Sequence, residues 1–150
     1  DEPTGNLDSR TSQDVLSLMK VTGQKFAQTI VMITHNMGVV AEMADDVAVM
    51  YMGNIVEYGS VEEVFVHPVH PYTRALLRSI PVLGKGKDQQ LEPIRGMTPD
   101  PFHRPKGCQF CPRCDFATER CEKEMPQEEW ISSGHYARCF HIGEGSVNGK

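Results

Sequence analysis

The sequence predicts an α/β fold that has two parts, a layered α/β part and a small irregular module rich in cysteine. Two observations predict the layered part. Helical and strand-like patterns alternate over residues 1–60, and the apolar run 29–34 is rich in β-branched residues, as buried parallel strands are. A third observation predicts the module, because all five cysteines lie between residues 108 and 139. A module of this size cannot fold on apolar burial alone, so we expect a metal centre to hold it together.

The first part of the layered region is expected to hold two helices around one strand. Apolar residues recur at helical spacing after Ser9, so a helix is predicted to begin at Ser9 or Thr11 and to end near Gly23. The run 29–34 then predicts a buried parallel strand, and 36–44 predicts a short helix.

A hairpin and two helices are expected next. Two strand-like runs, 47–52 and 54–58, flank a glycine and predict a hairpin at the edge of the sheet. Ser60 and Glu63 have the spacing of a capping box, which predicts that a helix begins there. Pro71 can occupy the first turn of a second helix, and the intervening turn is expected to contain His67 and His70.

Composition divides the chain into five segments. They are the layered core (1–60), a helical extension (61–84), a linker rich in proline and glycine (85–107), the cysteine-rich module (108–142) and a frayed tail (143–150).

Charge and hydropathy indicate whether the chain binds nucleic acid or enters a membrane. The net charge is −5, and no basic stripe is present to neutralise a phosphate backbone, so we expect no binding to nucleic acid. The apolar runs are far shorter than the ~20 residues that cross a bilayer. Any association with a membrane is therefore expected to come through a partner protein.

The cysteines follow the pattern C-x2-C-x2-C-x6-C-x17-C. Their clustering, in a chain without a secretion signal, favours ligation of a metal in a reducing compartment over disulfides. Thiolates suit both zinc and iron–sulfur centres, and the spacing alone leaves these two alternatives open. His135 is expected at the surface or beside the ligands, because four cysteines already suffice.

Asp1, Glu2 and His35 have the residue types of a site that hydrolyses nucleotides. One carboxylate can hold magnesium, a second can orient or deprotonate water, and a histidine after a strand can contact the γ-phosphate. The G-x-x-x-x-G-K-[ST] phosphate loop does not occur in these 150 residues. We therefore expect the chain to be the C-terminal piece of a longer ATPase and to be inactive alone.

Longer motifs identify the kind of ATPase. Asp1-Glu-Pro-Thr-Gly-Asn-Leu-Asp8, Ile33-Thr-His35 and the series Met50-Tyr-Met-Gly-Asn-Ile-Val-Glu-Tyr-Gly59 resemble, in order, three motifs of the ATP-binding cassette (ABC) ATPases. The resemblance implies the C-terminal portion of a P-loop NTPase core that uses ATP and Mg²⁺. It implies that Asp1 is the magnesium-linked aspartate, Glu2 the catalytic glutamate, Asp8 the D-loop aspartate and His35 the γ-phosphate sensor.

The tail resembles a subfamily. The runs His67-Pro-Val-His-Pro-Tyr-Thr and Gly107-Cys-Gln-Phe-Cys-Pro-Arg-Cys114 look like the extension of the oligopeptide/dipeptide importer ATPases. By this resemblance the tail holds a 4Fe-4S cluster, with zinc as the alternative, and Cys111 is a spare thiol. The implied ligands are Cys108, Cys114, Cys121 and Cys139.

The resemblance also implies a place in the cell and a set of partners. The implied role is ATP-driven peptide import at the cytoplasmic face of the plasma membrane. The implied partners are membrane-spanning permease subunits, a second identical or related ATPase subunit and, indirectly, an external peptide-binding protein. An alternative reading is a stand-alone iron–sulfur or zinc module without catalysis.

Overall fold

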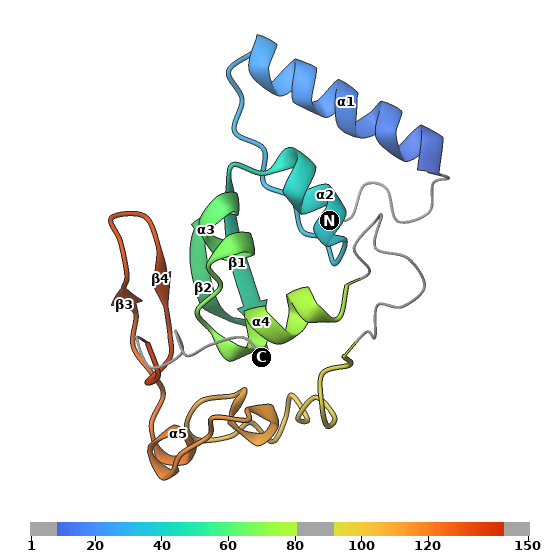
Figure 1. The fold of residues 1–150 in the computed structure, drawn as a ribbon. Helices are drawn as coiled ribbons and strands as arrows, with labels where there is room; N and C mark the ends of the chain where they lie inside the picture. Colours follow the sequence, from blue (N-terminus) through green and yellow to red (C-terminus); the bar gives the residue numbers. More distant parts are fainter. Residues whose placement is uncertain (1–8, 81–91, 143–150) are drawn as a thin grey trace. The chain divides into compact units, whose positions relative to one another are not determined.

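The computed structural model describes residues 9–80 and 92–142 of the chain (Figure 1). Asp1, Glu2 and Asp8 lie outside the described residues. The chain divides into two compact units, Asp1–Ala44 and Asp45–Lys150. The elements in chain order are α1 (Ser9–Lys25), α2 (Met37–Met43), β1 (Asp46–Tyr51), β2 (Asn54–Ser60), α3 (Val61–Val66), α4 (Pro71–Arg78), the 3₁₀ turn η1 (Cys111–Arg113), α5 (Glu119–Lys123), β3 (Glu129–Trp130) and β4 (Tyr136–Ala137).

The first unit holds the two helices that the sequence predicts. α1 runs two residues past Gly23, and it buries Leu16. α2 begins after Asn36, whose side-chain oxygen accepts hydrogen bonds from the backbone N–H groups of Gly38 (3.0 Å) and Val39 (3.3 Å). This cap satisfies two amides that the first turn of a helix leaves unpaired.

The prediction of a strand over residues 29–34 is wrong, since this segment has no regular secondary structure. Val31 is 86% exposed and Ile33 is 63% exposed, so the run is not buried either. A parallel strand forms only beside a neighbour that pairs with its N–H and C=O groups. No segment within residues 9–80 and 92–142 pairs with this run, so its β-branched composition alone does not make it a strand.

The second unit is built on the predicted hairpin of β1 and β2. Side chains of β1 alternate between exposed and buried, which gives the strand one face on the core. The two turn residues have positive φ, +48° at Met52 and +82° at Gly53. Positive φ at both central residues is the backbone of a type I′ turn, whose twist matches that of the flanking strands.

A second hairpin completes the sheet, and the sequence did not predict it. β4 pairs antiparallel with both β2 and β3, which gives the strand order β1-β2-β4-β3. Its pairing continues past the strand, because the Arg138 N–H donates to the Val56 carbonyl (2.9 Å). The fold is therefore mixed α/β with a small antiparallel sheet, and residues from the predicted cysteine-rich segment supply two of its strands.

The two helices after β2 begin where the sequence predicts. The Ser60 hydroxyl accepts from the Glu63 N–H (3.2 Å), while the Glu63 carboxylate accepts from the Ser60 N–H (3.2 Å), so both halves of the capping box are present. α4 has Pro71 in its first turn, and His70 is its N-cap.

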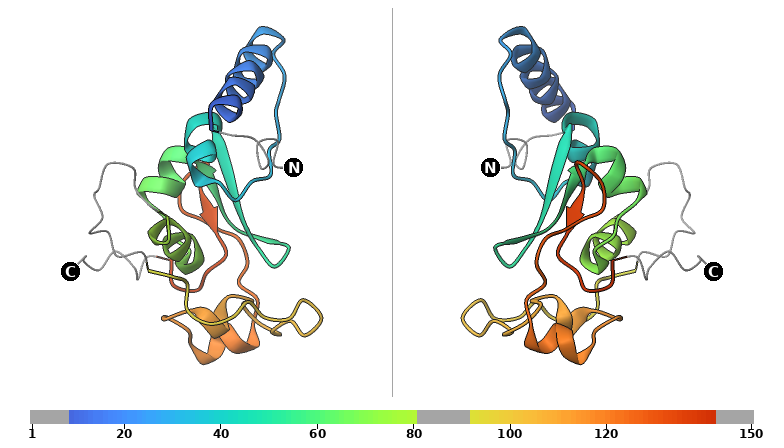
Figure 2. Two further views of the ribbon diagram at one scale, coloured as in Figure 1. Left: turned by 90° about the vertical axis from the view of Figure 1, so that its right-hand side faces the viewer. Right: turned by 90° about the vertical axis from the view of Figure 1, so that its left-hand side faces the viewer.

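Aromatic rings join the sheet, α4 and the cysteine-rich segment. The ring of Tyr51, at the end of β1, lies 4.7 Å from that of Tyr72 and 5.3 Å from that of Phe110, measured between centroids. Arg113 adds polar contacts, since its guanidinium donates to the carbonyls of Arg95 (2.8 Å) and Ile94 (3.2 Å). Figure 2 shows from two sides that the segment with η1 and α5 forms an irregular lobe at one end of this unit.

Candidate functional site

Only one of the four residues expected to handle ATP, His35, lies within the described part of the chain. Asp1, Glu2 and Asp8 lie outside it. His35 is described and exposed, and it lies directly before the cap of α2. The distances between His35 and the three acidic residues are therefore untested, and their roles stay predictions.

The cysteines, by contrast, meet at one place. A pocket in the second unit is lined by every cysteine of the chain, together with two histidines and several apolar residues. The lining residues are Cys108, Cys111, Cys114, Cys121, Cys139, His70, His141, Pro71, Phe110, Pro126 and Phe140. All five cysteines are free thiols. The four predicted ligands thus share one pocket, and Cys111 lies on it as well.

A run of tight turns brings the first three cysteines to the pocket. The Cys111 N–H donates to the Cys108 carbonyl (3.0 Å), and the Cys114 N–H donates to the Cys111 carbonyl (3.1 Å). Such i to i+3 bonds are those of a 3₁₀ turn, in which residues three apart lie on the same side. The C-x2-C-x2-C spacing therefore directs three thiols the same way.

The other two cysteines come from α5 and from the end of β4. The Cys108 N–H donates to the Cys121 carbonyl (2.8 Å), which fixes α5 against the first turn. A side chain at Gly107 would not fit, because its Cβ would lie 2.3 Å from the Cys121 carbonyl oxygen. Cys139 is buried two residues after β4.

The thiols differ in how readily they ionise. Burial raises the pKa of Cys114 to about 11, and burial also raises the pKa values of Cys108, Cys111 and Cys139. Burial disfavours the thiolate at Cys121 too, but hydrogen bonds outweigh it and lower the pKa of that residue. They come from the Thr118 hydroxyl (Oγ1 to Sγ, 3.3 Å) and the His141 ring (Nε2 to Sγ, 3.7 Å).

Within the two described ranges, no group of three or more His, Cys, Asp or Glu side chains is arranged to hold a metal ion. The donor set nevertheless fits a centre that takes soft sulfur ligands. Five reduced thiols line one pocket, and the other lining residues are apolar apart from the two histidines. The apolar lining limits the access of water to such a centre.

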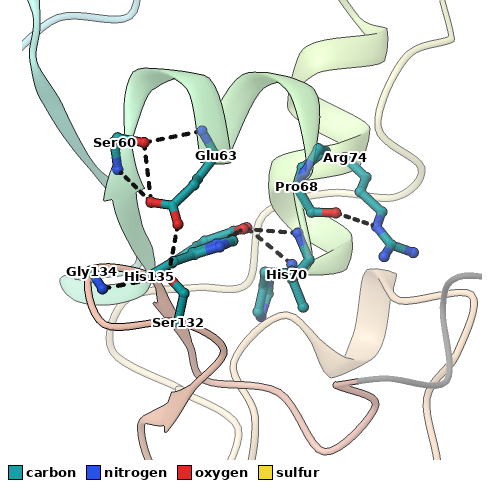
Figure 3. Close-up of polar contacts among 10 residues, drawn as sticks. Ser60, Glu63, Pro68, His70, Arg74, Ser132, Gly134 and His135 are labelled. Carbon is teal, nitrogen blue, oxygen red and sulfur yellow. Dashed lines mark hydrogen bonds and ion pairs between the residues drawn. The ribbon is translucent and has the colours of Figure 1, made fainter.

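A buried carboxylate links this region to the sheet, and sequence reasoning missed it. Glu57 in β2 is fully buried. Its oxygens accept from the N–H groups of Val69 (2.8 Å) and His70 (3.0 Å), and Oε1 lies 2.9 Å from Nε2 of His135 (Figure 3). The expectation that His135 lies at the surface or beside the cysteine ligands is wrong, because it is 3% exposed and contacts Glu57 instead. A glutamate between Val56 and Tyr58, in the middle of β2, was the available signal.

The capping box also reaches the second hairpin. The Ser132 hydroxyl donates to Oε1 of Glu63 (2.7 Å), as Figure 3 shows. This hydrogen bond and the one from the Ser60 N–H lower the pKa of the Glu63 carboxyl. Glu57 and Glu63 together therefore attach the β3–β4 hairpin to β2 and α3.

His70 lies between the Glu57 network and the cysteine pocket. Its backbone N–H donates to Glu57, while its side chain caps α4 by accepting from the Tyr72 N–H at Nδ1 (3.1 Å). The residue is 1% exposed. Burial, with a smaller contribution from Arg74, lowers the pKa of the imidazole to about 4.

Comparison with known proteins gives consistent matches. Residues 56–121 match the family described as "Oligopeptide/dipeptide transporter, C-terminal region". The chain is 46% identical over 140 residues to the oligopeptide transport ATP-binding protein AppD of Bacillus subtilis, which covers 93% of this chain and 42% of that protein.

Two proteins of Haemophilus influenzae are similar to the chain as well. The oligopeptide transport ATP-binding protein OppD is 46% identical over 144 residues, covering 96% of this chain and 44% of OppD. The dipeptide transport ATP-binding protein DppF is 40% identical over 142 residues, covering 95% of this chain and 43% of DppF. The chain thus spans less than half the length of these relatives.

Proposed function

Because the chain belongs to the oligopeptide/dipeptide family of ABC transporter ATP-binding subunits, as a C-terminal part of such a subunit, we propose that it works in an ATP-driven peptide importer. The observation that carries this proposal is the 46% identity to AppD over 93% of the chain. The ordered series of motifs from Asp1 to Gly59 adds support. Fold alone would not carry the assignment, since one fold hosts many activities.

In this proposal the acidic residues and the histidine act on the terminal phosphate of ATP. Asp1 holds Mg²⁺, Glu2 orients or deprotonates the attacking water, Asp8 belongs to the D-loop, and His35 contacts the γ-phosphate. His35 is exposed beside the cap of α2, which is compatible with this role. The rest of the longer subunit would supply the phosphate loop and, across a dimer, the signature motif.

ATP hydrolysis by the full-length subunit tests these roles. We expect Glu2→Gln and His35→Ala each to lower turnover about 10²-fold or more, because each removes a group that acts on the reacting water or phosphate. Glu62→Gln and His67→Ala are matched controls at exposed positions of α3 and its C-terminal end, and they should keep wild-type turnover. Wild-type turnover in Glu2→Gln or in His35→Ala would remove the role assigned to that residue.

The proposed partners follow from the same family membership. They are membrane-spanning permease subunits, a second ATPase subunit and, indirectly, an external peptide-binding protein, with the chain at the cytoplasmic face of the plasma membrane. Among the described residues, no helix has the length and apolar character needed to cross a membrane. The proposed attachment to the membrane is through the permease subunits.

We further propose that the cysteine pocket holds a 4Fe-4S cluster, with zinc as the alternative. The convergence of all five thiols on one apolar pocket supports this. The ligands would be Cys108, Cys114, Cys121 and Cys139, and a bound cluster would supply a one-electron centre or a structural crosslink. A cluster would need these residues as thiolates, and Cys121 is the one of the four whose pKa is lowered.

Metal analysis after anaerobic purification tests the cluster. We expect about four irons and four sulfides per chain and their loss in Cys114→Ser. Cys111→Ser is the matched control, because it removes a thiol of the same pocket that is not an expected ligand. Zinc in place of iron would establish the alternative, and a folded chain without metal would overturn both.

A further inference from the structure

A second cleft in the second unit has the composition of a small-molecule site. Its volume is about 350 Å³, and the pockets that bind small molecules measure roughly 300–1,000 Å³. Apart from one threonine and two arginines, the described residues that line it are apolar or aromatic. What we call the arginine cleft is lined by residues that include Met50, Met52, Tyr72, Ile94, Arg104 and Arg113.

The two arginines carry positive charge that no described carboxylate balances. Among the residues that the structure describes, neither Arg104 nor Arg113 forms an ion pair, and the described lining contains no aspartate or glutamate. The carboxylate of Asp100, which lies between two lining prolines, has other partners, the Phe102 N–H (2.9 Å) and Nδ1 of His103 (2.7 Å). An anion is therefore attracted to this cleft.

Arg113 supplies a fixed charge and few free donors. Its guanidinium donates to the carbonyls of Arg95 (2.8 Å) and Ile94 (3.2 Å), and to the hydroxyls of Thr98 (3.3 Å) and Tyr51 (3.4 Å). These bonds use four of the five N–H groups that a guanidinium has. The side chain is therefore held in place before any ligand binds, which lowers the entropy that binding costs.

Arg104 supplies the free donors. The residue is exposed, and its Nε donates to the Pro101 carbonyl (3.1 Å). This bond orients the guanidinium and leaves the two terminal nitrogens for a ligand. Their parallel N–H groups match the two oxygens of a carboxylate, which arginine binds with two hydrogen bonds at once.

We propose that the arginine cleft binds a small organic carboxylate with an apolar body. Arg104 binds its carboxylate, the charge of Arg113 adds to the attraction, and the apolar body lies against Met50, Tyr72 and Ile94. A phosphate fits less well, because it has three terminal oxygens to pair and Arg113 has few donors left. The inference depends neither on a metal nor on ATP, since the described lining shares no residue with the cysteine pocket or with the expected ATP site.

The test is the binding of phenylbutyrate to the full-length subunit, measured by calorimetry. Phenylbutyramide has the same ring and chain but no charge, so we expect it to bind about tenfold more weakly or worse, because the charge-assisted hydrogen bonds are lost. Acetate and inorganic phosphate lack the apolar body and should also bind at least about tenfold more weakly than phenylbutyrate.

Variants at exposed positions of the cleft test each part of the site. Arg104→Gln should weaken the binding of phenylbutyrate about tenfold, while Arg78→Gln, at the exposed end of α4 and outside the described lining, should leave it unchanged. Met50 is 56% exposed, so both of its variants should fold. Met50→Glu should abolish binding by repelling the carboxylate, and Met50→Gln is its uncharged control and should retain binding.

Methionine methyl resonances locate the bound probe. Met50 and Met52 line the cleft, and Met125 is not among the lining residues. In the full-length subunit labelled with ¹³C-methyl methionine, we expect phenylbutyrate to shift the signals of Met50 and Met52 and to leave that of Met125 in place. Shifts at Met125 without shifts at Met50 and Met52 would place the probe elsewhere and overturn the proposal.

The calorimetric results can overturn it as well. Equal binding of phenylbutyrate and its amide, or unchanged binding in Arg104→Gln, would remove the carboxylate site. Phosphate that binds as tightly as phenylbutyrate would refute the class of ligand, and a wild-type subunit that binds no phenylbutyrate would refute the site itself. None of these results would change ATP turnover, which tests the proposed function separately.

Discussion

At the scale of single residues, Glu57 is a carboxylate with several polar contacts. Its carboxylate accepts hydrogen bonds from two backbone N–H groups and contacts the His135 ring. The Glu57 side chain is fully buried. Removing one member of such a buried network leaves the others without partners, which is more harmful than losing an exposed pair.

We therefore expect Glu57→Ala to lower the free energy of unfolding by about 3–5 kcal/mol. Urea unfolding of the chain measures this, with Glu62→Ala as the control, because Glu62 is exposed on α3. A loss below about 1 kcal/mol, similar to that of an exposed pair, would contradict the account.

The buried imidazole of His70 gives a prediction for pH. The pKa of His70 is lowered from 6.5 to about 4 in the folded chain, so between these values the unfolded chain binds a proton that the folded chain does not. Stability should therefore fall as the pH decreases from 6.5 to 4, by on the order of 3 kcal/mol from this residue.

The comparison of wild type with His70→Asn isolates that contribution, because other titrating groups are common to both. Glu63, for instance, has a pKa lowered from 4.5, so the stability that its carboxylate contributes is lost as the pH falls from 4.5 through its folded-state pKa. Urea unfolding at several pH values should show that the free energy of unfolding falls less between pH 6.5 and 4 in His70→Asn than in the wild type. Equal losses in both proteins would rule out a neutral, buried His70.

At the scale of elements, the β1–β2 turn carries backbone strain at a residue other than glycine. Met52 has φ of +48° next to Gly53, and asparagine adopts such positive values more easily than methionine. We expect Met52→Asn to stabilise the chain by about 0.5–1 kcal/mol. Thermal unfolding measures this, with Gly53→Ala as the opposite case, and a destabilised Met52→Asn would contradict the type I′ assignment.

The elements that the sequence predicts correctly are those with local causes. The capping box of Ser60 and Glu63, the proline at the start of α4 and the hairpin around Gly53 each depend on residues close in sequence. Such signals need no knowledge of the rest of the fold.

The elements that the sequence misses depend on distant partners. The run 29–34 has the composition of a strand but no described strand to pair with. β4 consists of Tyr136 and Ala137, too short to show a period, and it exists because β2 offers it an edge. The contact of Glu57 with His135 joins residues 78 positions apart, so no local pattern reveals it.

The candidate site shows the same division. Spacing indicated that the cysteines act together, and the turns from Cys108 to Cys114 explain why. That His70 also lines this pocket could not be predicted, because the sequence places His70 in a turn between helices, about forty residues before the first cysteine. Only the packing of α4 against the cysteine-rich segment, through Tyr72 and Phe110, brings it there.

At the scale of the whole molecule, the cysteine pocket and the sheet belong to one compact unit. β2 pairs with β4, Cys139 follows β4, and Arg113 holds the segment before the cysteines at the carbonyls of Ile94 and Arg95. A group bound by the thiols would therefore be connected to β2, which contains Glu57, through Cys139 and the pairing of β4 with β2.

ATP-driven uptake of a labelled oligopeptide tests the assignment to a peptide importer most directly. The full-length subunit would be reconstituted in vesicles with its permease subunits and the external binding protein. We expect uptake that requires ATP and is abolished by Glu2→Gln, with Glu62→Gln as the unaffected control. Peptide uptake that continues at the wild-type rate in Glu2→Gln, or ATP hydrolysis that drives no peptide uptake, would contradict it.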